Sequence, residues 1–292
     1  MELSATESTV KDFYLLLKPR VISLVVFTGV CGFVLAPGAS SVHPFLAIIA
    51  VLSLAIGAGA SGAINMWYDR DIDSIMNRTK NRPIPSGRVP AAEGLAFAII
   101  LSLLSIMILG LALNWVSAGI LAFANFFYSV IYTMWLKRHT PQNIVIGGAA
   151  GAFPPMIGWA AVTGDVSIDS VVLFAIIFFW TPPHFWALSL FANEDYKRAN
   201  IPMLTVTHGE RATKIQMLIY TVILFPVCLV PVYTGLVGVD YAVVSIILNG
   251  LFLVSAVKTY FEKEGHKNAR RMFAYSIFYL FAMFSALVIC SL

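Results

Sequence analysis

One stretch of the chain places three oxygen-bearing side chains at a spacing of four residues. Asn65, Asp69 and Asp73 follow one another where a long apolar run gives way to charged residues. Residues four apart on a helix lie on one face, so the three side chains would form a column. Two carboxylates and an amide oxygen in a column repel one another without a cation, and Mg²⁺ prefers such oxygen ligands. The alternative is a solvated helix end whose acids pair with neighbouring basic side chains.

A basic loop that is rich in proline follows this column. It extends over residues 77–88 and contains Arg78, Lys80 and Arg82, together with proline and glycine residues that restrict the backbone. Guanidinium and ammonium groups bind phosphate oxygens strongly. Because side chains suited to a divalent cation precede side chains suited to phosphate, the combination predicts a diphosphate-binding site.

A second group of polar residues lies in another apolar run. Pro182 and Pro183 are expected to break a membrane helix just before His184, which lies among aromatic residues. The His184 ring could ligate a metal within a substrate or transfer a proton. It could equally be a buried ring that only satisfies a backbone carbonyl.

The same run ends in an acidic segment. Asp195, next to Asn193 and Glu194, could hold a second Mg²⁺, and Lys197 and Arg198 could neutralise phosphate. Solvated loop charges are the alternative interpretation. The spacing is not a regular four-residue column, so this segment is the less specific signal of the two.

Small and aromatic residues indicate where an apolar substrate could lie. Gly147, Gly148 and Gly151 leave little side-chain volume along one helix, which favours either close helix packing or a slot for a long or flat molecule. Tyr128 and Tyr132 could line the same chamber or lie at the membrane interface. A diphosphate site beside a dry chamber with aromatic walls suits the departure of diphosphate and the protection of an allylic cation. The residues thus indicate prenyl transfer as a class of reaction, without identifying the acceptor.

Membrane helices must position these residues. Of the 292 residues, 59% are hydrophobic and 12% are charged, whereas a typical soluble domain has about 25% charged residues. This composition argues against a soluble enzyme, a nucleic-acid-binding protein and a disordered scaffold. Cys31, Cys228 and Cys290 lie in apolar runs without metal-binding spacing, and we expect them to be buried free thiols.

Nine stretches are apolar and long enough to cross a membrane, which takes roughly 20 residues. We therefore expect an all-α, polytopic membrane protein with a single domain over residues 1–292. The predicted spans are residues 21–36, 45–66, 95–113, 118–136, 143–162, 171–190, 215–233, 242–257 and 272–290.

The loops between these spans alternate in charge. Those at residues 37–44, 112–116, 163–170 and 231–241 contain no lysine or arginine, and the other set contains all 19 basic residues of the chain. The positive-inside rule places the basic loops, the N-terminus and both acidic groups at the cytoplasmic face, and the C-terminus outside. Because the chain starts with neither a secretory signal nor a transit peptide, we expect it in a bacterial inner membrane.

These motifs together resemble the UbiA superfamily of intramembrane prenyltransferases. The resemblance rests on the column of asparagine and aspartates, on the basic loop after the second span and on the acidic segment after the sixth. Segments 78–88, 180–186 and 195–204 resemble, more specifically, the members of that superfamily that farnesylate haem. The resemblance extends from about Lys18 to about Lys214.

The resemblance implies nine helices around a central cavity and a Mg²⁺-dependent reaction of two substrates. Farnesyl diphosphate loses its diphosphate, a vinyl group of haem B captures the farnesyl cation, and water completes the product, haem O. A downstream haem-modifying enzyme or assembly factors of haem–copper oxidases are further expected partners. By position, the resemblance assigns Mg²⁺ to Asn65, Asp69, Asp73 and Asp195, the diphosphate to Arg78, Lys80, Arg82 and Lys197, and the haem iron or propionates to His184.

The chain departs from the superfamily pattern in one respect. Phe191 lies four residues before Asp195 and Ala199 lies four residues after it, so the second acidic segment lacks a regular pair of aspartates. This departure puts a second Mg²⁺ site with two carboxylates in question, and Glu194 could compensate for the missing aspartate.

Two other functions fit parts of the sequence. The acceptor could be an aromatic acid, a naphthoate or a chlorin, although a phenolic acceptor has no evident use for the segment around His184. Nine spans with broken helices could also form a small-molecule transporter with its substrate site at the bilayer midplane. Against a transporter, the polar residues gather at one face of the membrane and almost none lie in the outer half.

Overall fold

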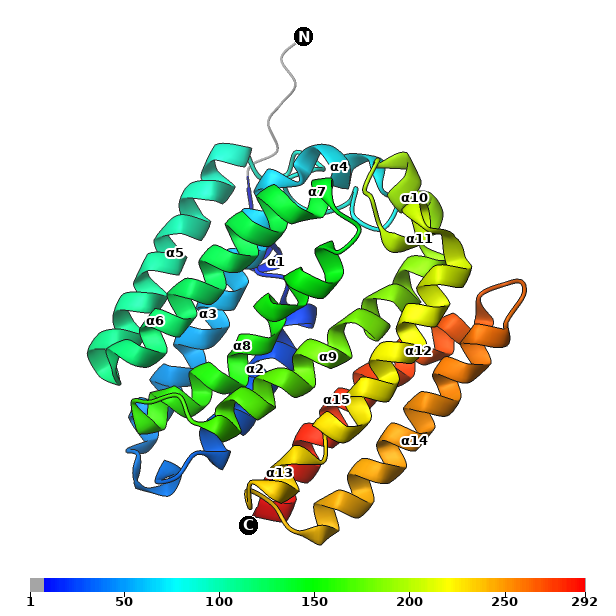
Figure 1. Ribbon diagram of the computed structural model, residues 1–292. Coiled ribbons are helices and arrows are strands. Elements are labelled where there is room, and N and C mark those ends of the chain that lie inside the picture. The colour runs from blue at the N-terminus through cyan, green and yellow to red at the C-terminus, as the bar shows by residue number, and fades with distance from the viewer. Residues whose placement is uncertain (1–7, 292) are drawn as a thin grey trace.

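The computed structural model describes residues 8–291, and over these residues it contains helices and loops but no strand (Figure 1). Most of the helices run along one axis and form an elongated bundle. The predicted all-α fold is therefore confirmed. In chain order the elements are α1 (Val10–Leu16), α2 (Pro19–Leu35), η1 (Ala39–Ser41), α3 (Pro44–Tyr68), α4 (Arg70–Ile75), α5 (Ala91–Ala112), α6 (Trp115–Phe126), η2 (Phe127–Leu136), α7 (Lys137–His139), α8 (Asn143–Thr163), α9 (Ile168–Phe191), α10 (Asn193–Arg198), α11 (Leu204–Thr207), α12 (Gly209–Val227), α13 (Val230–Tyr233), α14 (Val239–Phe261) and α15 (Lys267–Ser291).

Eight helical segments among the described residues are long and apolar enough to cross a membrane, and a bent pair supplies a ninth. The pair is α1 and α2, which meet at an angle of 53°. Lys18 between them has a φ of 52°, and Pro19 then begins α2 because its ring suits the first turn of a helix. The chain is thus an integral membrane protein, and each predicted span lies within one of these segments or extends at most one residue beyond it.

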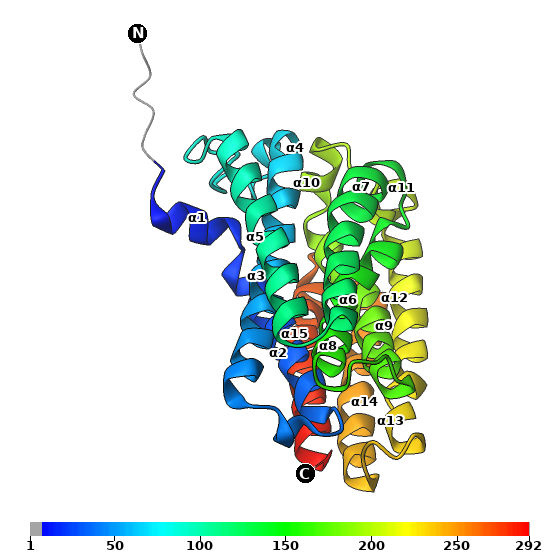
Figure 2. The same ribbon diagram turned by 90° about the vertical axis from the view of Figure 1, so that its left-hand side faces the viewer.

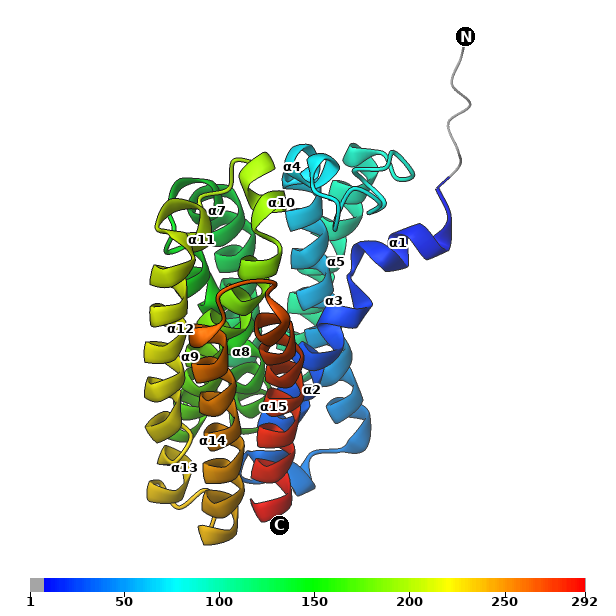
Figure 3. The same cartoon turned by 90° about the vertical axis from the view of Figure 1, so that its right-hand side faces the viewer.

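Six elements surround a central cavity. α2, α3, η2, α8, α9 and α15 each contribute side chains to its wall. α2 packs on both α8 and α15, so the first and last spans close the ring. α5 packs outside this ring on α3 and α6, while α12 packs on α9 and α14 lies against α12 and α15 (Figures 2 and 3). The predicted arrangement of helices around a cavity is confirmed.

The short helices and loops divide between the two ends of the bundle. α4, α7, α10 and α11 lie together at one end, at the top of Figure 1, and the basic loops are at this end. The loops after α2, α8 and α13, which lack lysine and arginine, lie at the opposite end. This distribution places the column of Asn65 and its two aspartates at the basic end.

One expectation about α9 is wrong. Pro182 and Pro183 do not break this helix, which continues through them over 24 residues. Each proline lacks a backbone N–H and leaves a carbonyl one turn earlier without its helical donor. The carbonyls concerned are those of Phe178 and Phe179, and α9 packs against α8, α12 and α15. Packing against neighbouring helices allows a membrane helix to continue past proline.

The glycine-rich stretch of α8 serves both purposes that the sequence left open. Gly158 permits close packing, because a Cβ atom there would lie 2.0 Å from the carbonyl oxygen of Gly29 in α2. Gly147 makes room for an aromatic ring, since its Cβ would lie 2.1 Å from Cδ2 of Tyr132. Gly151 borders the cavity, and a Cβ there would meet no other atom within 4 Å. Helix packing and cavity space therefore alternate along one helix.

The cysteines behave largely as expected. All three are free thiols; Cys31 and Cys228 are buried, whereas Cys290 is only partly buried near the end of α15. None takes part in the site described below.

Candidate active site

A cavity of about 1000 Å³ lies between the six surrounding elements. This volume is at the upper end of the usual range for ligand sites, roughly 300–1,000 Å³. Most of the wall is apolar and comes from α2, α8, α9 and α15. One end is polar and mostly charged, and its side chains include Lys18, Asn65, Asp73, Arg78, Arg82 and Lys137.

The predicted column of oxygen-bearing side chains forms at this charged end. Asn65 lies in the last turn of α3, Asp69 joins α3 to α4, and Asp73 lies in α4. The backbone keeps its helical hydrogen bonds across the junction, with N–H groups of Asp69 and Asp73 donating to the carbonyls four residues earlier at 2.9 and 2.8 Å. All three residues are buried, with 4%, 0% and 2% of their surface exposed. Buried carboxylates require counter-charges or hydrogen-bond donors.

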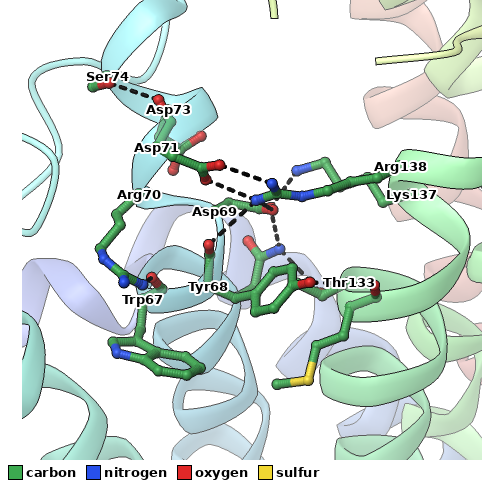
Figure 4. A network of polar contacts seen from close by, with 12 residues as sticks. Trp67, Tyr68, Asp69, Arg70, Asp71, Asp73, Ser74, Thr133, Lys137 and Arg138 are labelled. Carbon is green, nitrogen blue, oxygen red and sulfur yellow. Dashed lines mark hydrogen bonds and ion pairs between the residues drawn. The ribbon is translucent and has the colours of Figure 1, made fainter. Parts of the chain in front are cut away.

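Two lysines from distant parts of the chain contact the first two members of the column. Lys18 donates from Nζ to Oδ1 of Asn65 at 2.6 Å. Lys137, at the start of α7, forms an ion pair with Asp69 (Figure 4). Asn65 also donates from Nδ2 to Oδ2 of Asp69 at 2.8 Å. The column is therefore a connected network of polar contacts.

The basic loop reaches the third member of the column. Arg82 donates from Nη1 to Oδ2 of Asp73 at 2.6 Å. The other oxygen of Asp73 has no hydrogen-bond partner in the part of the chain that the structure describes, and Asp73 borders the cavity. Arg78 borders the cavity as well, whereas Lys80 is exposed and donates to Asn77 at 3.3 Å. Two of the three basic residues predicted in this loop thus reach the cavity.

Asp71 faces Arg138 and does not border the cavity (Figure 4), and Nη2 of Arg138 also lies 3.5 Å from Oδ1 of Asp69. The Asp71 side chain is 61% exposed, and its two oxygens accept from the Nη atoms of Arg138 at 2.7 and 2.8 Å. These hydrogen bonds hold the pKa of the Asp71 carboxyl below its ordinary value. The pair connects α7 to α4 at the rim of the site without entering the cavity.

A π-helix faces the column. Within η2, the Thr133 hydroxyl donates to the carbonyl oxygen of Tyr128 at 2.7 Å and accepts from Nδ2 of Asn65 at 3.1 Å. The rings of Tyr128 and Tyr132 stack with centroids 5.5 Å apart, and both border the cavity. π-helical turns occur frequently at functional sites. No pattern in the sequence predicts this one.

His184 borders the apolar part of the cavity. Its ring lies between the rings of Trp180 and Phe273, with centroids 4.4 and 4.7 Å away and interplanar angles of 18° and 23°. Nδ1 of His184 is 2.6 Å from Oγ of Ser276. Phe273 and Ser276 belong to α15, so the last span completes the surroundings of this ring.

The second acidic segment lies outside the cavity wall. Asp195 pairs with Arg198 within α10, and Lys197 donates to Glu194 at 2.9 Å. Tyr196, between them, is the residue of α10 that borders the cavity. The structure thus brings Asn65, Asp73, Tyr128, Tyr132 and His184 to one cavity, with Asp69 buried behind its wall, and leaves Asp195, Lys197 and Arg198 at its periphery.

Several site residues escaped prediction from the sequence. They include Lys18, Lys137, Phe273 and Ser276. Basic residues at the cytoplasmic ends of membrane spans are ordinary, so the positions of the two lysines do not distinguish them. The two residues of α15 lie in a span without any polar motif, and only the packing of α15 against α9 reveals them.

The donor set suits Mg²⁺ that is bound together with a phosphate. Among the described residues, no three His, Cys, Asp or Glu side chains come close enough to hold a metal ion by themselves. Mg²⁺ is usually held by one or two carboxylates and completes its ligands with water and substrate phosphates. Asp69, Asp73 and Oδ1 of Asn65 provide such oxygens on one helix face; Asn65 and Asp73 border the charged end of the cavity, and Asp69 is buried next to them.

Comparisons with known proteins agree with this geometry. The UbiA prenyltransferase family matches the chain over residues 25–282. The protoheme IX farnesyltransferase of Agrobacterium fabrum strain C58 is 56% identical over 286 residues, which cover 97% of this chain and 90% of the relative. That of Jannaschia sp. strain CCS1 is 55% identical over 284 residues, which cover 95% and 91%.

Two solved structures share the fold. The structure of a digeranylgeranylglyceryl phosphate synthase has a TM-score of 0.79 and 17% identity, and the match covers 97% of this chain and 98% of the other. A UbiA homologue from Archaeoglobus fulgidus, bound to DMAPP and Mg²⁺, has a TM-score of 0.69 and 19% identity, with 94% and 99% covered.

Proposed function

We propose, since the chain belongs to the UbiA prenyltransferase family, that it transfers the farnesyl group of farnesyl diphosphate to a vinyl group of haem B and releases haem O and diphosphate. The names of relatives whose sequences are 55% and 56% identical to this chain support this choice of substrates. The observation that carries the proposal is one cavity that joins a charged end to an apolar chamber bordered by His184.

The charged end is suited to bind the diphosphate. Arg78, Arg82, Lys18 and Lys137 border it and can donate to phosphate oxygens. We assign Mg²⁺ to the column next to these groups, as the Mg²⁺ in the Archaeoglobus fulgidus homologue suggests. When bound, Mg²⁺ neutralises negative charge that develops on the departing diphosphate.

The transfer step needs no oxidant or reductant. The bond between C1 of the farnesyl group and the diphosphate oxygen breaks, and the diphosphate leaves with the electron pair. The π electrons of the haem vinyl group form the new bond to C1. Water then adds to the cationic vinyl carbon next to the porphyrin ring and loses a proton, so the haem gains a farnesyl group and a hydroxyl group.

The apolar chamber supports this step by excluding water from the allylic cation. Its wall consists of side chains such as Val21, Leu24, Phe27, Ile177 and Phe281. The faces of aromatic rings stabilise nearby positive charge by about 0.5–2 kcal/mol. The stacked pair Tyr128 and Tyr132 lies between the charged end and α8, where such a cation would form.

The basic residues outside the cavity wall receive a different role. We assign Lys80, Lys197 and Arg198 to the electrostatic attraction of diphosphate toward the cavity, and Asp195 to fixing α10 through its ion pair with Arg198. A second Mg²⁺ near Asp195 would require additional oxygen ligands from the substrate.

The proposal includes the placement of the protein in a bacterial inner membrane as one domain over residues 1–292. The basic loops at the charged end support a cytoplasmic position for that end and for the N-terminus, with the C-terminus outside. A downstream haem-modifying enzyme or assembly factors of haem–copper oxidases are the partners expected to receive the product.

The test is product analysis by mass spectrometry. Purified protein in detergent is incubated with haem B, farnesyl diphosphate and Mg²⁺, and the haem is expected to gain one farnesyl and one hydroxyl group. Asp73→Asn should abolish this product. The matched control Asp71→Asn removes a carboxylate two residues away that points out of the site, and this variant should retain the product.

Two other outcomes distinguish the alternatives. Release of diphosphate with unmodified haem would indicate a prenyltransferase with another acceptor, such as an aromatic acid, a naphthoate or a chlorin. No reaction of either substrate with folded wild-type protein would contradict an enzymatic function and favour a transporter.

A further inference from the structure

The ring of His184 is fixed in its plane and in its rotation. Trp180 and Phe273 cover its two faces, and Phe185 meets its edge with centroids 5.1 Å apart at an angle of 84°. The residue is buried, with 9% of its surface exposed. A ring held in this way presents each of its two nitrogen atoms in one direction.

The hydrogen bonds of Ser276 determine which nitrogen of His184 bears the proton. The Ser276 hydroxyl donates to the carbonyl oxygen of Phe273 at 2.6 Å. A carbonyl oxygen can only accept, so the single hydroxyl hydrogen must lie in this contact. The contact of 2.6 Å between Ser276 Oγ and His184 Nδ1 then requires the imidazole to donate. Nδ1 of His184 is therefore protonated.

The second nitrogen of a neutral His184 ring is left with a lone pair. Nε2 has no hydrogen-bond partner among the described residues. It is also not fully buried, so the atom retains some accessible surface. His184 borders the cavity, so the space next to Nε2 is the cavity. A nitrogen without a proton cannot donate to a carboxylate, which excludes a hydrogen bond to a haem propionate. It can ligate iron, as neutral imidazole does in many metal sites.

We propose that Nε2 of His184 ligates the iron of the haem substrate and that Ser276 is a positioning residue that holds His184 in the Nδ1-protonated tautomer. This inference rests on haem as the acceptor in the proposed function. A ligating histidine commonly donates its other N–H to a partner that fixes the tautomer and the ring orientation. Because the ring cannot turn between Trp180 and Phe273, the iron–nitrogen bond would fix the orientation of the flat macrocycle, and hence of its vinyl groups, in the cavity.

The tautomer can be measured without haem. The chain has five histidines, and protein labelled with ¹⁵N at histidine gives one pair of nitrogen signals for each in a nuclear magnetic resonance spectrum. Comparison with His184→Gln identifies the pair that belongs to His184. We expect Nδ1 to show the signal of a protonated nitrogen and Nε2 that of an unprotonated one. A protonated Nε2 with an unprotonated Nδ1 would overturn the assignment.

Iron ligation is tested with haem B alone, in the absence of farnesyl diphosphate. The wild-type complex is expected to show the absorption and electron paramagnetic resonance spectra of histidine-ligated haem. His184→Gln, which retains a side chain that can donate hydrogen bonds, should lose these spectra, and added imidazole should restore them in His184→Ala. Unchanged spectra in His184→Gln would refute the ligand role.

Ser276 is tested by substitutions that remove or keep its hydroxyl group. Removal of a partner that orients a metal ligand typically lowers metal affinity or activity about 10–100-fold. We therefore expect Ser276→Ala to bind haem about 10-fold more weakly than the wild type and with an altered absorption spectrum. Ser276→Thr keeps the hydroxyl and should retain the wild-type spectrum. Ser189→Ala is the matched control, because this buried hydroxyl in α9 bonds only the carbonyl of Trp186. Equal effects of Ser276→Ala and Ser189→Ala would reduce Ser276 to a structural residue.

The measurements also separate this inference from the proposed function. Wild-type protein that produces haem O without a histidine-ligated haem spectrum would overturn the inference and leave the function intact. Wild-type protein that ligates haem through His184 but never farnesylates it would support the ligation and overturn the proposed reaction.

Discussion

Removal of the charge on Asp69 should destabilise the protein and stop the reaction, and a second substitution should separate the two effects. Asp69 has no exposed side-chain surface, and it pairs with Lys137, whose side chain is 16% exposed. Asp69→Asn leaves this ammonium group nearly buried without its counter-charge. Removal of one partner of a buried ion pair costs about 3–5 kcal/mol. Because Lys137 retains some contact with water, we expect a value near the lower end, about 3 kcal/mol.

Removal of Lys137 as well should restore most of the stability. Replacement of both members of a buried ion pair by uncharged side chains is often nearly neutral. We therefore expect Asp69→Asn/Lys137→Met to lie within about 1 kcal/mol of the wild type. Lys137→Met alone leaves the wholly buried Asp69 carboxylate without this counter-charge and should also cost about 3 kcal/mol, so we expect a coupling energy of about 5–6 kcal/mol between the two sites. Formation of haem O should stay about 100-fold below the wild type in the double variant, because the carboxylate assigned to Mg²⁺ is still missing.

The assay combines unfolding with product formation. The four proteins of the cycle are unfolded with sodium dodecyl sulfate in mixed micelles and followed by circular dichroism, and haem O is quantified in parallel. The control cycle uses Glu194→Gln and Lys197→Met, a pair in α10 whose side chains are 79% and 49% exposed and for which we expect a coupling energy of about 0–1 kcal/mol. Additive effects of Asp69→Asn and Lys137→Met, within about 0.5 kcal/mol, would refute a buried ion pair. Recovery of activity in the double variant would refute the role of Asp69 in the reaction.

Three further predictions concern the cavity and its ligands. In steady-state kinetics, Arg82→Met should raise the KM for farnesyl diphosphate by about 10–100-fold, since a charge-assisted contact is worth roughly 1.5–3 kcal/mol. Lys80→Met, on the same loop but outside the cavity, should change this KM less than 3-fold. Gly151→Leu should fold normally, because a Cβ at this position meets no atom within 4 Å, but it should block product formation by filling the cavity. Gly158→Ala should lower the unfolding midpoint, because its Cβ would lie 2.0 Å from the Gly29 carbonyl oxygen. Removal of Mg²⁺ by a chelator should abolish diphosphate release, and Mg²⁺ added in excess should restore it; release that persists in chelator would contradict the assignment of Mg²⁺ to the column.

The parts of the site that could be predicted from the sequence are those that depend on local geometry. Asn65, Asp69 and Asp73 share a face because the spacing of four residues survives the junction of α3 and α4, where the backbone hydrogen bonds continue. The spans could be predicted because a lipid environment demands long apolar helices. These features need no knowledge of which helices are neighbours.

The remaining features depend on tertiary packing. Lys137 contacts Asp69 only because η2 runs beside α3, and Ser276 contacts His184 only because α15 packs on α9. The expected break at Pro182 was wrong for the same reason, since the neighbouring helices of α9 stabilise a course that the proline alone would not favour. Local propensity is a weak guide where tertiary contacts dominate.

The charges around the column explain why metal and diphosphate should enter the site together. Lys18, Arg82 and Lys137 contribute three positive charges, against two negative charges from Asp69 and Asp73. A lone Mg²⁺ would have to displace these cations from the carboxylates and would add positive charge to a site that already has an excess of it. A diphosphate offers the lysines and the arginine new anionic partners, which frees carboxylate oxygens for Mg²⁺. The same basic side chains can therefore neutralise the column before substrate binds and the diphosphate afterwards, and so keep buried charges paired in both states.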